Sequence, residues 1–231
     1  GNVHVLPRSG FGPRLVYVLG GSENDDDGEC LSTVDVYDPR TDAWKQLSSM
    51  PTERSVHGGA ALDGKIYVMG GYTNSDDGIL RTADVYDPQS NQWQPLAQMA
   101  SARWGCAAAA AGGKVYAIGG QNNDDESLAT VEAFDPLLGA WAFVASMSFD
   151  RNSHAAAVVD GKIYVLGGFY SGTEQCTDSV EMYDPQMDSW QQMASMPDAR
   201  HRHKATSMGG KIYLTGGCLD SDSHGLSLIH I

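Results

Sequence analysis

The sequence has few basic residues and no long apolar run. Among 231 residues, 15 are Lys or Arg and 29 are Asp or Glu, which gives a formal net charge of −14. Because a phosphate backbone or an anionic membrane surface would repel such a chain, we expect neither a nucleic acid nor a membrane as its partner. No apolar run reaches the ~18 residues that a transmembrane helix requires.

Cysteines are also sparse, and they are not paired. Cys30, Cys106, Cys176 and Cys218 lie tens of residues apart without a C-x-x-C pair, which excludes a zinc clip or a small disulfide scaffold. None of the seven Asn lies in an N-x-[ST] sequon. Both absences favour a reducing compartment, so we expect a cytoplasmic protein; a secreted protein that lacks both features is the alternative.

Signals for targeting and for common catalytic sites are missing as well. The first residues, GNVHVLPRSG, contain neither a starting Met nor an apolar signal region, so the chain is expected to be a fragment or a trimmed form. There is no G-x-S-x-G elbow, P-loop or G-x-G-x-x-G. We therefore expect no catalytic residues, no cofactor and no enzyme, although 42% hydrophobic residues are enough for a packed core.

A repeat of 48 to 50 residues runs along the chain. Each of the five repeats has a Tyr three residues before a Gly-Gly doublet. In four of them an aromatic-Asp-Pro follows, with a Trp six residues after that Asp and an Arg ten residues after the Trp. The doublets are Gly20-Gly21, Gly70-Gly71, Gly119-Gly120, Gly167-Gly168 and Gly216-Gly217. The template Trp residues are Trp44, Trp93, Trp141 and Trp190, and the template Arg residues are Arg54, Arg103, Arg151 and Arg200.

Each repeat is predicted to form four short strands, which we name A to D. In the repeat over 151–195, strand A covers 154–159, strand B covers 162–166 after an Asp-Gly turn, strand C covers 179–183, and strand D begins at Trp190. No segment has a sustained helical period. A four-stranded unit with a period near ~50 residues predicts a β-propeller blade of the kelch kind, whereas WD40 blades repeat every ~40–45 residues.

The doublet, the Tyr-Asp-Pro, the Trp and the Arg together resemble kelch repeats, as in the propeller of kelch-like (BTB-kelch) proteins. The resemblance implies an all-β propeller of four-stranded antiparallel blades that binds a protein or peptide. It further implies substrate recognition for a cullin-RING ubiquitin ligase adaptor, with cullin-3 bound through BTB and BACK domains for which this chain has no room. Family members that bind actin or act as scaffolds, and carbohydrate-active members such as mutarotases, are the alternatives.

The repeats are expected to cover residues 8–217, followed by a truncated or non-native tail over 218–231. This organisation predicts an incomplete ring of about four to five blades, open and with exposed strand edges. The first blade is expected to lack a convincing strand A, because Arg8 to Tyr17 is shorter than in the other repeats. The fifth blade is expected to end after strand B, with the tail arriving where strand C belongs.

Four antiparallel strands place the B–C loops and the D–A connections at one end of a blade, where binding is expected. Most Tyr and Trp occupy template positions and are expected in the core; Trp141 and Tyr164 should be buried, and truncating either should cost ~3–5 kcal/mol. Three Tyr and Trp residues, joined by one Phe, fall outside the template and within these loops, and exposed Trp and Tyr are enriched in binding hot spots. They are Tyr72, Trp104, Phe169 and Tyr170. Packing against a neighbouring loop is the alternative for each.

We call the end of the blades that carries the B–C loops and the D–A connections the mouth. The resemblance to kelch-like proteins implies that Arg, Ser, Asn and Tyr side chains at the mouth contact an acidic peptide. Carried over by position, two binding residues, Tyr72 and Phe169, come directly after a Gly-Gly doublet. Gln121 and Asn123 are the first and third residues after the doublet Gly119-Gly120. Ser153 and Arg202 stand two residues beyond a template Arg. The match is partial, because Val56 and Gly105 stand at the remaining two positions. The template Arg residues recur in every repeat and are expected to have a structural role.

Acidic residues are expected in the B–C loops, and Arg and His residues in the D–A connections at the mouth. His57, Cys106, His154 and His203 share one repeat position, but adjacent blades lie ~10 Å apart and zinc needs ligands within ~2.3 Å, so no metal site is expected. The acidic run 23–28 resembles a calcium loop. Val34 stands where such a loop needs a bidentate Glu, so a solvated loop is expected, with weak calcium binding as the alternative.

Overall fold

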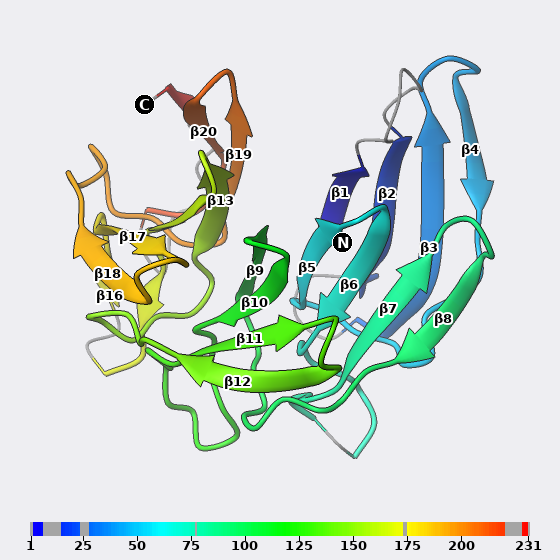
Figure 1. Cartoon of the computed structure of the whole chain (residues 1–231), viewed down its shortest axis with the longest axis horizontal. Coiled ribbons are helices and arrows are strands. Elements are labelled where there is room, and N and C mark those ends of the chain that lie inside the picture. Colours follow the sequence, from blue (N-terminus) through cyan, green and yellow to red (C-terminus); the bar gives the residue numbers. More distant parts are fainter. Residues whose placement is uncertain are drawn as a thin grey trace. The chain divides into compact units, whose positions relative to one another are not determined.

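A computed structural model describes residues 2–6, 15–23, 28–76, 78–172, 175–219 and 228–230. The chain divides into two compact units, unit 1 over Gly1–Trp104 and unit 2 over Gly105–Ile231, and each is described by itself. The described residues form strands, turns and loops and include no helix, and so none that could cross a bilayer. Figure 1 shows the strands as successive small sheets along the chain.

Unit 1 contains two four-stranded antiparallel sheets, blades 1 and 2, in which neighbouring strands follow chain order. Blade 1 consists of β1 (Asn2–Leu6), β2 (Leu15–Ser22), β3 (Cys30–Asp38) and β4 (Ala43–Gln46). Blade 2 consists of β5 (Gly58–Leu62), β6 (Lys65–Met69), β7 (Ala83–Asp87) and β8 (Gln92–Pro95).

Unit 2 contains blades 3, 4 and 5. Blade 3 consists of β9 (Ala107–Ala111), β10 (Lys114–Ile118), β11 (Val131–Asp135) and β12 (Ala140–Val144). Blade 4 consists of β13 (Ala155–Val159), β14 (Lys162–Leu166), β17 (Val180–Asp184) and β18 (Ser189–Gln192), and its B–C loop carries the small pair β15 (Phe169–Tyr170) and β16 (Gln175–Cys176). Blade 5 consists of β19 (Lys204–Met208), β20 (Lys211–Thr215) and β21 (Leu228–His230).

These sheets confirm the predicted antiparallel blades and their number, since the described residues build four sheets of four strands and one of three. The prediction that blade 1 lacks strand A was wrong. β1 pairs with β2 from Asn2↔Leu19 to Leu6↔Leu15, so the strand comes from residues before the stretch that the spacing argument considered. In blade 5, β21 pairs with β20 at the position of strand C, although it carries no Tyr-Asp-Pro. The predicted domain bounds and the origin of the tail stay predictions.

The hydrophobic core consists of residues from strands B and C that pack between successive blades. In unit 1, Tyr17 and Leu19 of β2 pack with Ile66 and Val68 of β6 and Tyr86 of β7. Unit 2 repeats this arrangement between blades 3 and 4 and again between blades 4 and 5. Strand B of blades 2 and 3 is therefore almost fully buried, as its uninterrupted apolar residues predict, whereas β20 of blade 5 is more open to solvent.

The template Trp residues differ from the prediction that they belong to the core. Trp93, Trp141 and Trp190 are half-buried, and Trp44 is 60% exposed, because strand D is the outermost strand of each blade. Each packs on the aromatic residue of its own Tyr-Asp-Pro or Phe-Asp-Pro, with ring centroids 5.0–5.2 Å apart. The predicted full burial of Trp141 and Tyr164 was therefore wrong, since both are half-buried.

Within each unit, one of these indole groups also bridges two blades. Trp93 Nε1 donates to the Ser48 carbonyl at 2.9 Å, and Trp190 Nε1 donates to the Ala145 carbonyl at 2.8 Å. In both cases the acceptor lies just after strand D of the preceding blade. No blade precedes blade 1 within the described part of unit 1, and its Trp44 is the most exposed of the four.

The Gly-Gly doublets mark where a D–A connection crosses the end of strand B. A Cβ atom on Gly167, at a φ of +60°, would lie 2.5 Å from the Arg200 carbonyl oxygen, and one on Gly71 would lie 2.6 Å from that of Ser55. Such distances leave no room for a side chain. The doublets thereby let the loop that carries each template Arg lie directly against the blade.

Candidate functional site

The template Arg side chains are fully buried within the D–A connections. In unit 1, Arg54 donates from Nη1 to the Gly70 carbonyl at 3.0 Å and pairs through Nη2 with Asp84 Oδ2 at 2.7 Å. In unit 2, Arg151 makes the equivalent contacts with the Gly167 carbonyl at 2.9 Å and with Glu181 Oε1 at 2.8 Å. A guanidinium sealed in this way stabilises the fold and does not reach a ligand, in agreement with the structural role predicted.

Sequence reasoning missed the carboxylate partners of these Arg residues. Asp84 and Glu181 each stand two residues before the Tyr of a Tyr-Asp-Pro, and Asp35 and Glu132 occupy the same place in their repeats. A recurring acidic residue on an otherwise buried strand is the signal that could have found them. Burial raises the pKa of Asp84, while the Arg54 guanidinium acts in the opposite direction.

Arg200 has a different carboxylate neighbour, because β21 carries no acidic residue. Its Nη2 lies 3.4 Å from Asp198 Oδ2, on a side chain that is 54% exposed. Its Nη1 still donates to a doublet carbonyl, that of Gly216, at 3.1 Å. The contact with the doublet thus persists in blade 5, and among the described residues the carboxylate beside Arg200 is the partly exposed one of Asp198.

Three successive D–A loops of unit 2 are joined in a row at the positions two residues beyond a template Arg. Ser153 N donates to the Gly105 carbonyl at 2.8 Å, and Arg202 N donates to the Ser153 carbonyl at 2.7 Å. All three residues have a left-handed backbone, with φ values of 53° to 63°. We call Gly105, Ser153 and Arg202 the loop row; it places two predicted binding residues, Ser153 and Arg202, next to each other.

The two binding residues of the loop row differ in exposure. The Arg202 side chain is exposed, whereas Ser153 is buried. Arg202 is therefore positioned to bind a ligand from solvent through its guanidinium, and Ser153 acts chiefly through its backbone, which holds Arg202 in place.

Among the described residues, most of the Arg and His side chains expected around the mouth are buried. His57, His154 and His203 are buried, as are the template Arg residues. In the D–A loops of unit 2, Arg202 is an exposed cation and His201 is half-buried beside it, while Lys204 is exposed as the first residue of β19. The Gly-Gly doublets bring these loops into close packing, which accounts for the burial of these side chains.

The predicted aromatic residues of unit 2 lie on the B–C loop of blade 4, and both are half-buried. The Phe169 ring lies against the His201 ring, with centroids 5.7 Å apart. The Tyr170 hydroxyl lies 3.2 Å from Thr177 Oγ1, and its ring lies 6.1 Å from that of Phe149. Tyr170 thus packs within the loop cluster, as the alternative interpretation held, while Phe169 flanks the loop row.

A polar cluster that sequence reasoning missed lies behind Phe169. The buried Asn152 donates from Nδ2 to Ser127 Oγ at 2.9 Å, and Ser127 Oγ lies 2.7 Å from Ser171 Oγ. The Asn152 backbone also pairs with that of Phe169 through two hydrogen bonds of 2.9 and 3.1 Å. These contacts join the B–C loops of blades 3 and 4 to one D–A connection and fix the position of Phe169.

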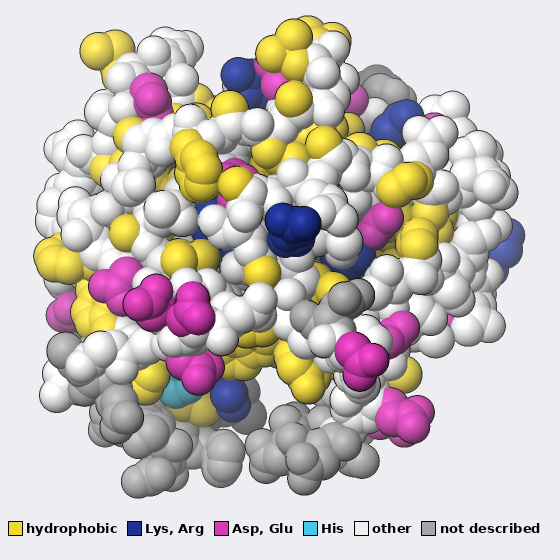
Figure 2. Space-filling view, turned by 90° about the horizontal axis from the view of Figure 1, so that it is seen from below, with side chains coloured by type: hydrophobic (Ala, Val, Ile, Leu, Met, Phe, Trp, Pro, Cys, Tyr) yellow, Lys and Arg dark blue, Asp and Glu magenta, His cyan; other side chains and the backbone are white. Residues whose placement is uncertain are grey.

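The B–C loop of blade 3 carries the predicted Gln121 and Asn123. Gln121 is half-buried and donates from Nε2 to Asp125 Oδ1 at 3.1 Å, and Asn123 is exposed. The same loop exposes Asp124, Asp125 and Glu126, as the sorting of charge predicted for B–C loops. Figure 2 shows one face of the molecule on which acidic side chains gather in small groups with few Lys and Arg side chains among them.

The other two predicted binding residues belong to unit 1. Tyr72 is 40% exposed, and its backbone pairs with Ser55 through two hydrogen bonds of 2.9 Å. Trp104 is half-buried. The eight predicted residues therefore fall into two groups, two in unit 1 and six in unit 2. Of the six, two belong to the loop row and four lie on the B–C loops of blades 3 and 4.

Two expectations about ions fall on the described residues only in part: no metal site at the shared His and Cys position, and a solvated loop over 23–28 with weak calcium binding as the alternative. Within them, no three His, Cys, Asp or Glu side chains come together in a set that could hold a metal ion. Most of the calcium-like run over 23–28 lies outside the described residues, since 24–27 are not among them.

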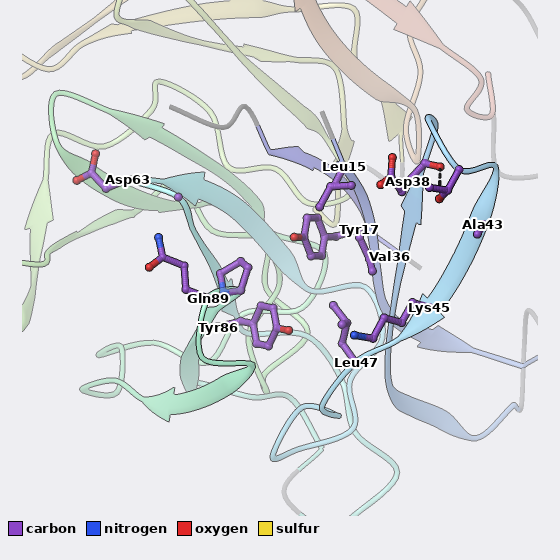
Figure 3. Close-up of a pocket in the computed structure, with 13 residues that line it drawn as sticks. Leu15, Tyr17, Val36, Asp38, Ala43, Lys45, Leu47, Asp63, Tyr86 and Gln89 are labelled. Atoms are coloured by element: carbon purple, nitrogen blue, oxygen red, sulfur yellow. Dashed lines mark hydrogen bonds between the residues drawn. The ribbon is translucent and has the colours of Figure 1, made fainter. Parts of the chain in front are cut away.

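Unit 1 also contains a cavity of about 920 Å³ that the sequence did not indicate. Figure 3 shows Tyr17 of β2, Val36 of β3, Lys45 of β4 and Tyr86 of β7 around it, together with Leu47. Its rim includes the turn residues Asp63, Gly64, Pro88 and Gln89, so it opens at the A–B and C–D end of the blades. Burial raises the pKa of Tyr86 to about 12. The cavity lies at the end opposite the predicted binding loops.

A match to a known protein family shows which kind of repeat the chain contains. Residues 12–217 match a family model described as "KLHDC2/KLHL20/DRC7 Kelch-repeats domain". The chain belongs to the kelch-repeat family. This membership confirms the resemblance that the Gly-Gly doublets, the Tyr-Asp-Pro, the Trp and the Arg indicated.

Kelch relatives and a solved structure agree with this assignment. Kelch-like protein 40 of Mus musculus is 44% identical over 61 residues, which cover 26% of this chain and 10% of the relative. The F-box/kelch-repeat protein At1g67480 of Arabidopsis thaliana is 44% identical over 63 residues, which cover 27% of this chain and 16% of the relative. The matched stretches are thus a small part of these relatives. The solved "Structure of YjhT" aligns with a TM-score of 0.74 at 19% identity over 88% of this chain and 69% of that one, which shows the same fold.

Proposed function

We propose that this kelch chain is a non-enzymatic protein-interaction module whose unit 2 loops bind an acidic peptide segment of a partner protein. The loop row carries the proposal, because it presents the exposed guanidinium of Arg202 from a backbone held by hydrogen bonds on the Ser153 side. A guanidinium binds a carboxylate through two parallel hydrogen bonds, which suits an Asp or Glu side chain of the ligand.

The surroundings of Arg202 support a peptide rather than a single carboxylate. Phe169 and His201 form an aromatic flank next to it, and Gln121 and Asn123 lie on the B–C loop of blade 3 with amide groups that can bind a peptide backbone. The exposed acidic residues of that loop would repel a ligand that places its carboxylates in another register.

The finer proposal is that this module recognises substrates for a cullin-RING ubiquitin ligase adaptor in the cytoplasm. The names of two relatives, Kelch-like protein 40 and an F-box/kelch-repeat protein, support it. Co-precipitation of cullin-3 with the product of the complete reading frame tests this part. Cosedimentation with actin filaments, without cullin binding, would favour the scaffolding alternative.

The peptide-binding proposal can be tested with a displayed library of random peptides and the purified chain. We expect the enriched peptides to contain Asp or Glu, and we expect Arg202→Ala to weaken a selected peptide about tenfold or more, as the loss of a charged hydrogen bond does. Arg40→Ala is the matched control, because Arg40 is an exposed Arg in a C–D turn at the other end of a blade. If the selected peptides lack acidic residues, or if Arg202→Ala and Arg40→Ala lose the same affinity, the peptide does not bind at the loop row.

Two variants in unit 1 test whether its loops also contact the peptide. If its loops also contact the peptide, Tyr72→Ala and Trp104→Ala should each weaken binding without unfolding the chain. Normal binding by these two variants, with a loss in Arg202→Ala, would confine the site to unit 2. Normal binding by all three would overturn the assignment of the loop face.

A further inference from the structure

A thiol and an imidazole lie side by side in unit 2. Cys176 Sγ, on β16 in the B–C loop of blade 4, is 3.0 Å from Nδ1 of His201 in the following D–A connection. Both side chains are half-buried and thus partly open to solvent. The two residues are 25 positions apart, so the contact depends on the packing of one loop on the next.

The same two repeat positions are occupied differently elsewhere, which provides an internal comparison. In unit 1 the equivalent pair is Cys30 and Ser55, with the sulfur 3.3 Å from a hydroxyl and the thiol buried. Between blades 3 and 4 the pair is Ser127 and Asn152, 2.9 Å apart. Of these three pairs, the one formed by Cys176 and His201 joins a nucleophile to a base.

Contacts on two sides hold His201 in this orientation. Its backbone pairs with Cys218 through hydrogen bonds of 3.0 and 3.1 Å, and its ring lies against Phe169. Burial and the neighbouring Arg202 lower the pKa of His201, so the imidazole is neutral near pH 7, and its Nδ1 atom, 3.0 Å from Cys176 Sγ, is placed to receive the thiol proton in the reaction step. A nucleophile, an adjacent base and a group that orients the base form the arrangement that activates cysteines.

We infer that Cys176 is a site of covalent modification by soft electrophiles such as α,β-unsaturated carbonyl compounds, activated by His201. In the step, His201 Nδ1 takes the thiol proton and the sulfur forms a bond to the β-carbon. The π electrons of the C=C bond move to the α-carbon, which then takes the proton from the imidazolium. The products are a thioether on Cys176 and a neutral His201. This inference does not depend on the proposed function.

Limiting iodoacetamide is a suitable probe, because the thioether forms with loss of iodide and each cysteine can be followed by mass spectrometry. At pH 7 we expect Cys176 of the native chain to react about tenfold faster than Cys218, which is also half-buried. Cys30 and Cys106 are buried and should react slowest, so they report on whether the chain stays folded. Equal rates at Cys176 and Cys218 in the unmodified sequence would overturn the inference without any variant.

His201→Asn tests the role of the imidazole, and Asn already occupies this repeat position at Asn152. The substitution should lower the Cys176 rate about tenfold, to that of Cys218, and leave the Cys218 rate unchanged. It should also change the pH profile of Cys176, so that the rate falls about tenfold per pH unit below the ordinary thiol pKa of ~8.5. A variant with unchanged rate and pH profile would show that His201 does not activate the thiol.

Discussion

The template Arg and the template Trp recur ten residues apart in every complete repeat, yet they occupy different surroundings. Arg54 and Arg151 are fully buried, with their carboxylate partners Asp84 and Glu181 sealed beside them. The Trp residues lie on the outermost strands and are half-buried or, at Trp44, exposed. Regular recurrence in the sequence therefore does not measure the burial of a side chain.

Removal of a buried Arg should give the largest effect. Arg151→Met leaves Glu181 as an uncompensated buried charge, so we expect a loss of about 3–5 kcal/mol in the free energy of unfolding, measured by urea denaturation. The double variant with Glu181→Leu should recover part of that loss. Arg200→Met should cost less, because its carboxylate neighbour Asp198 is 54% exposed. Equal losses for Arg151 and Arg200 would mean that the buried pair does not set the cost.

Filling the space beneath an Arg loop should have the next largest effect. A Cβ at Gly71 would meet the Ser55 carbonyl oxygen at 2.6 Å and His57 Cβ at 2.8 Å, whereas one at Gly64 would meet nothing within 4 Å. Both residues have positive φ, so Gly71→Ala and Gly64→Ala share the backbone strain of about 1–2 kcal/mol. We expect Gly71→Ala to cost about 3 kcal/mol in total, because it adds overpacking. Similar thermal unfolding curves for the two variants would contradict the close packing of the loop.

The histidine beside the Arg200 loop should make stability depend on pH. Burial and the charge of Arg200 lower the pKa of His203 from 6.5 to about 4, so the unfolded chain binds a proton that the folded chain excludes. The resulting stability is complete above about pH 6.5 and is lost as the pH falls towards 4, by on the order of 2–3 kcal/mol. His203→Leu should flatten this part of the profile, measured as urea midpoints between pH 4 and 7. A variant whose profile stays parallel to that of the original sequence would show that other groups cause the loss.

The template Trp residues should give the smallest effects, and they should differ from one another. Trp93→Ala removes ring packing on Tyr86 and the indole hydrogen bond to Ser48, so we expect a loss of about 2 kcal/mol. Trp44→Ala removes packing from a side chain that is 60% exposed and should cost less than about 1 kcal/mol. Both residues lie in unit 1, so urea midpoints of these two variants make a direct comparison. Equal costs would mean that the bridge to the preceding blade contributes nothing measurable.

Much of the blade could be predicted because its signals are local. The Asp160-Gly161 turn, the apolar run over 162–166 and the doublet Gly167-Gly168 lie within nine residues of one another. The Trp interpretation failed because a large aromatic residue suggests a core, whereas its exposure depends on the place of its strand in the sheet. Strand A of blade 1 was missed because β1 pairs with β2 across a connection that follows no repeat spacing.

The candidate site could be predicted only in part. Loop position correctly singled out Arg202 and Asn123 as exposed residues, since both lie outside the packed doublets. It gave no warning that Ser153 is buried or that Tyr170 uses its hydroxyl within its own loop. The loop row was also beyond sequence reasoning, because its hydrogen bonds join residues about one repeat apart.

The sequence by itself determined the strands, the turns and the kelch repeat, because short-range backbone preferences specify them within each repeat. Only the tertiary structure decided which repeated charges are sealed in ion pairs and which cation reaches solvent. It also decided that one thiol faces an imidazole while its counterpart in unit 1 faces a hydroxyl. These outcomes depend on the packing of loops that lie 25 or more residues apart, where the burial of a polar group is set by its neighbours and not by its own position in the chain.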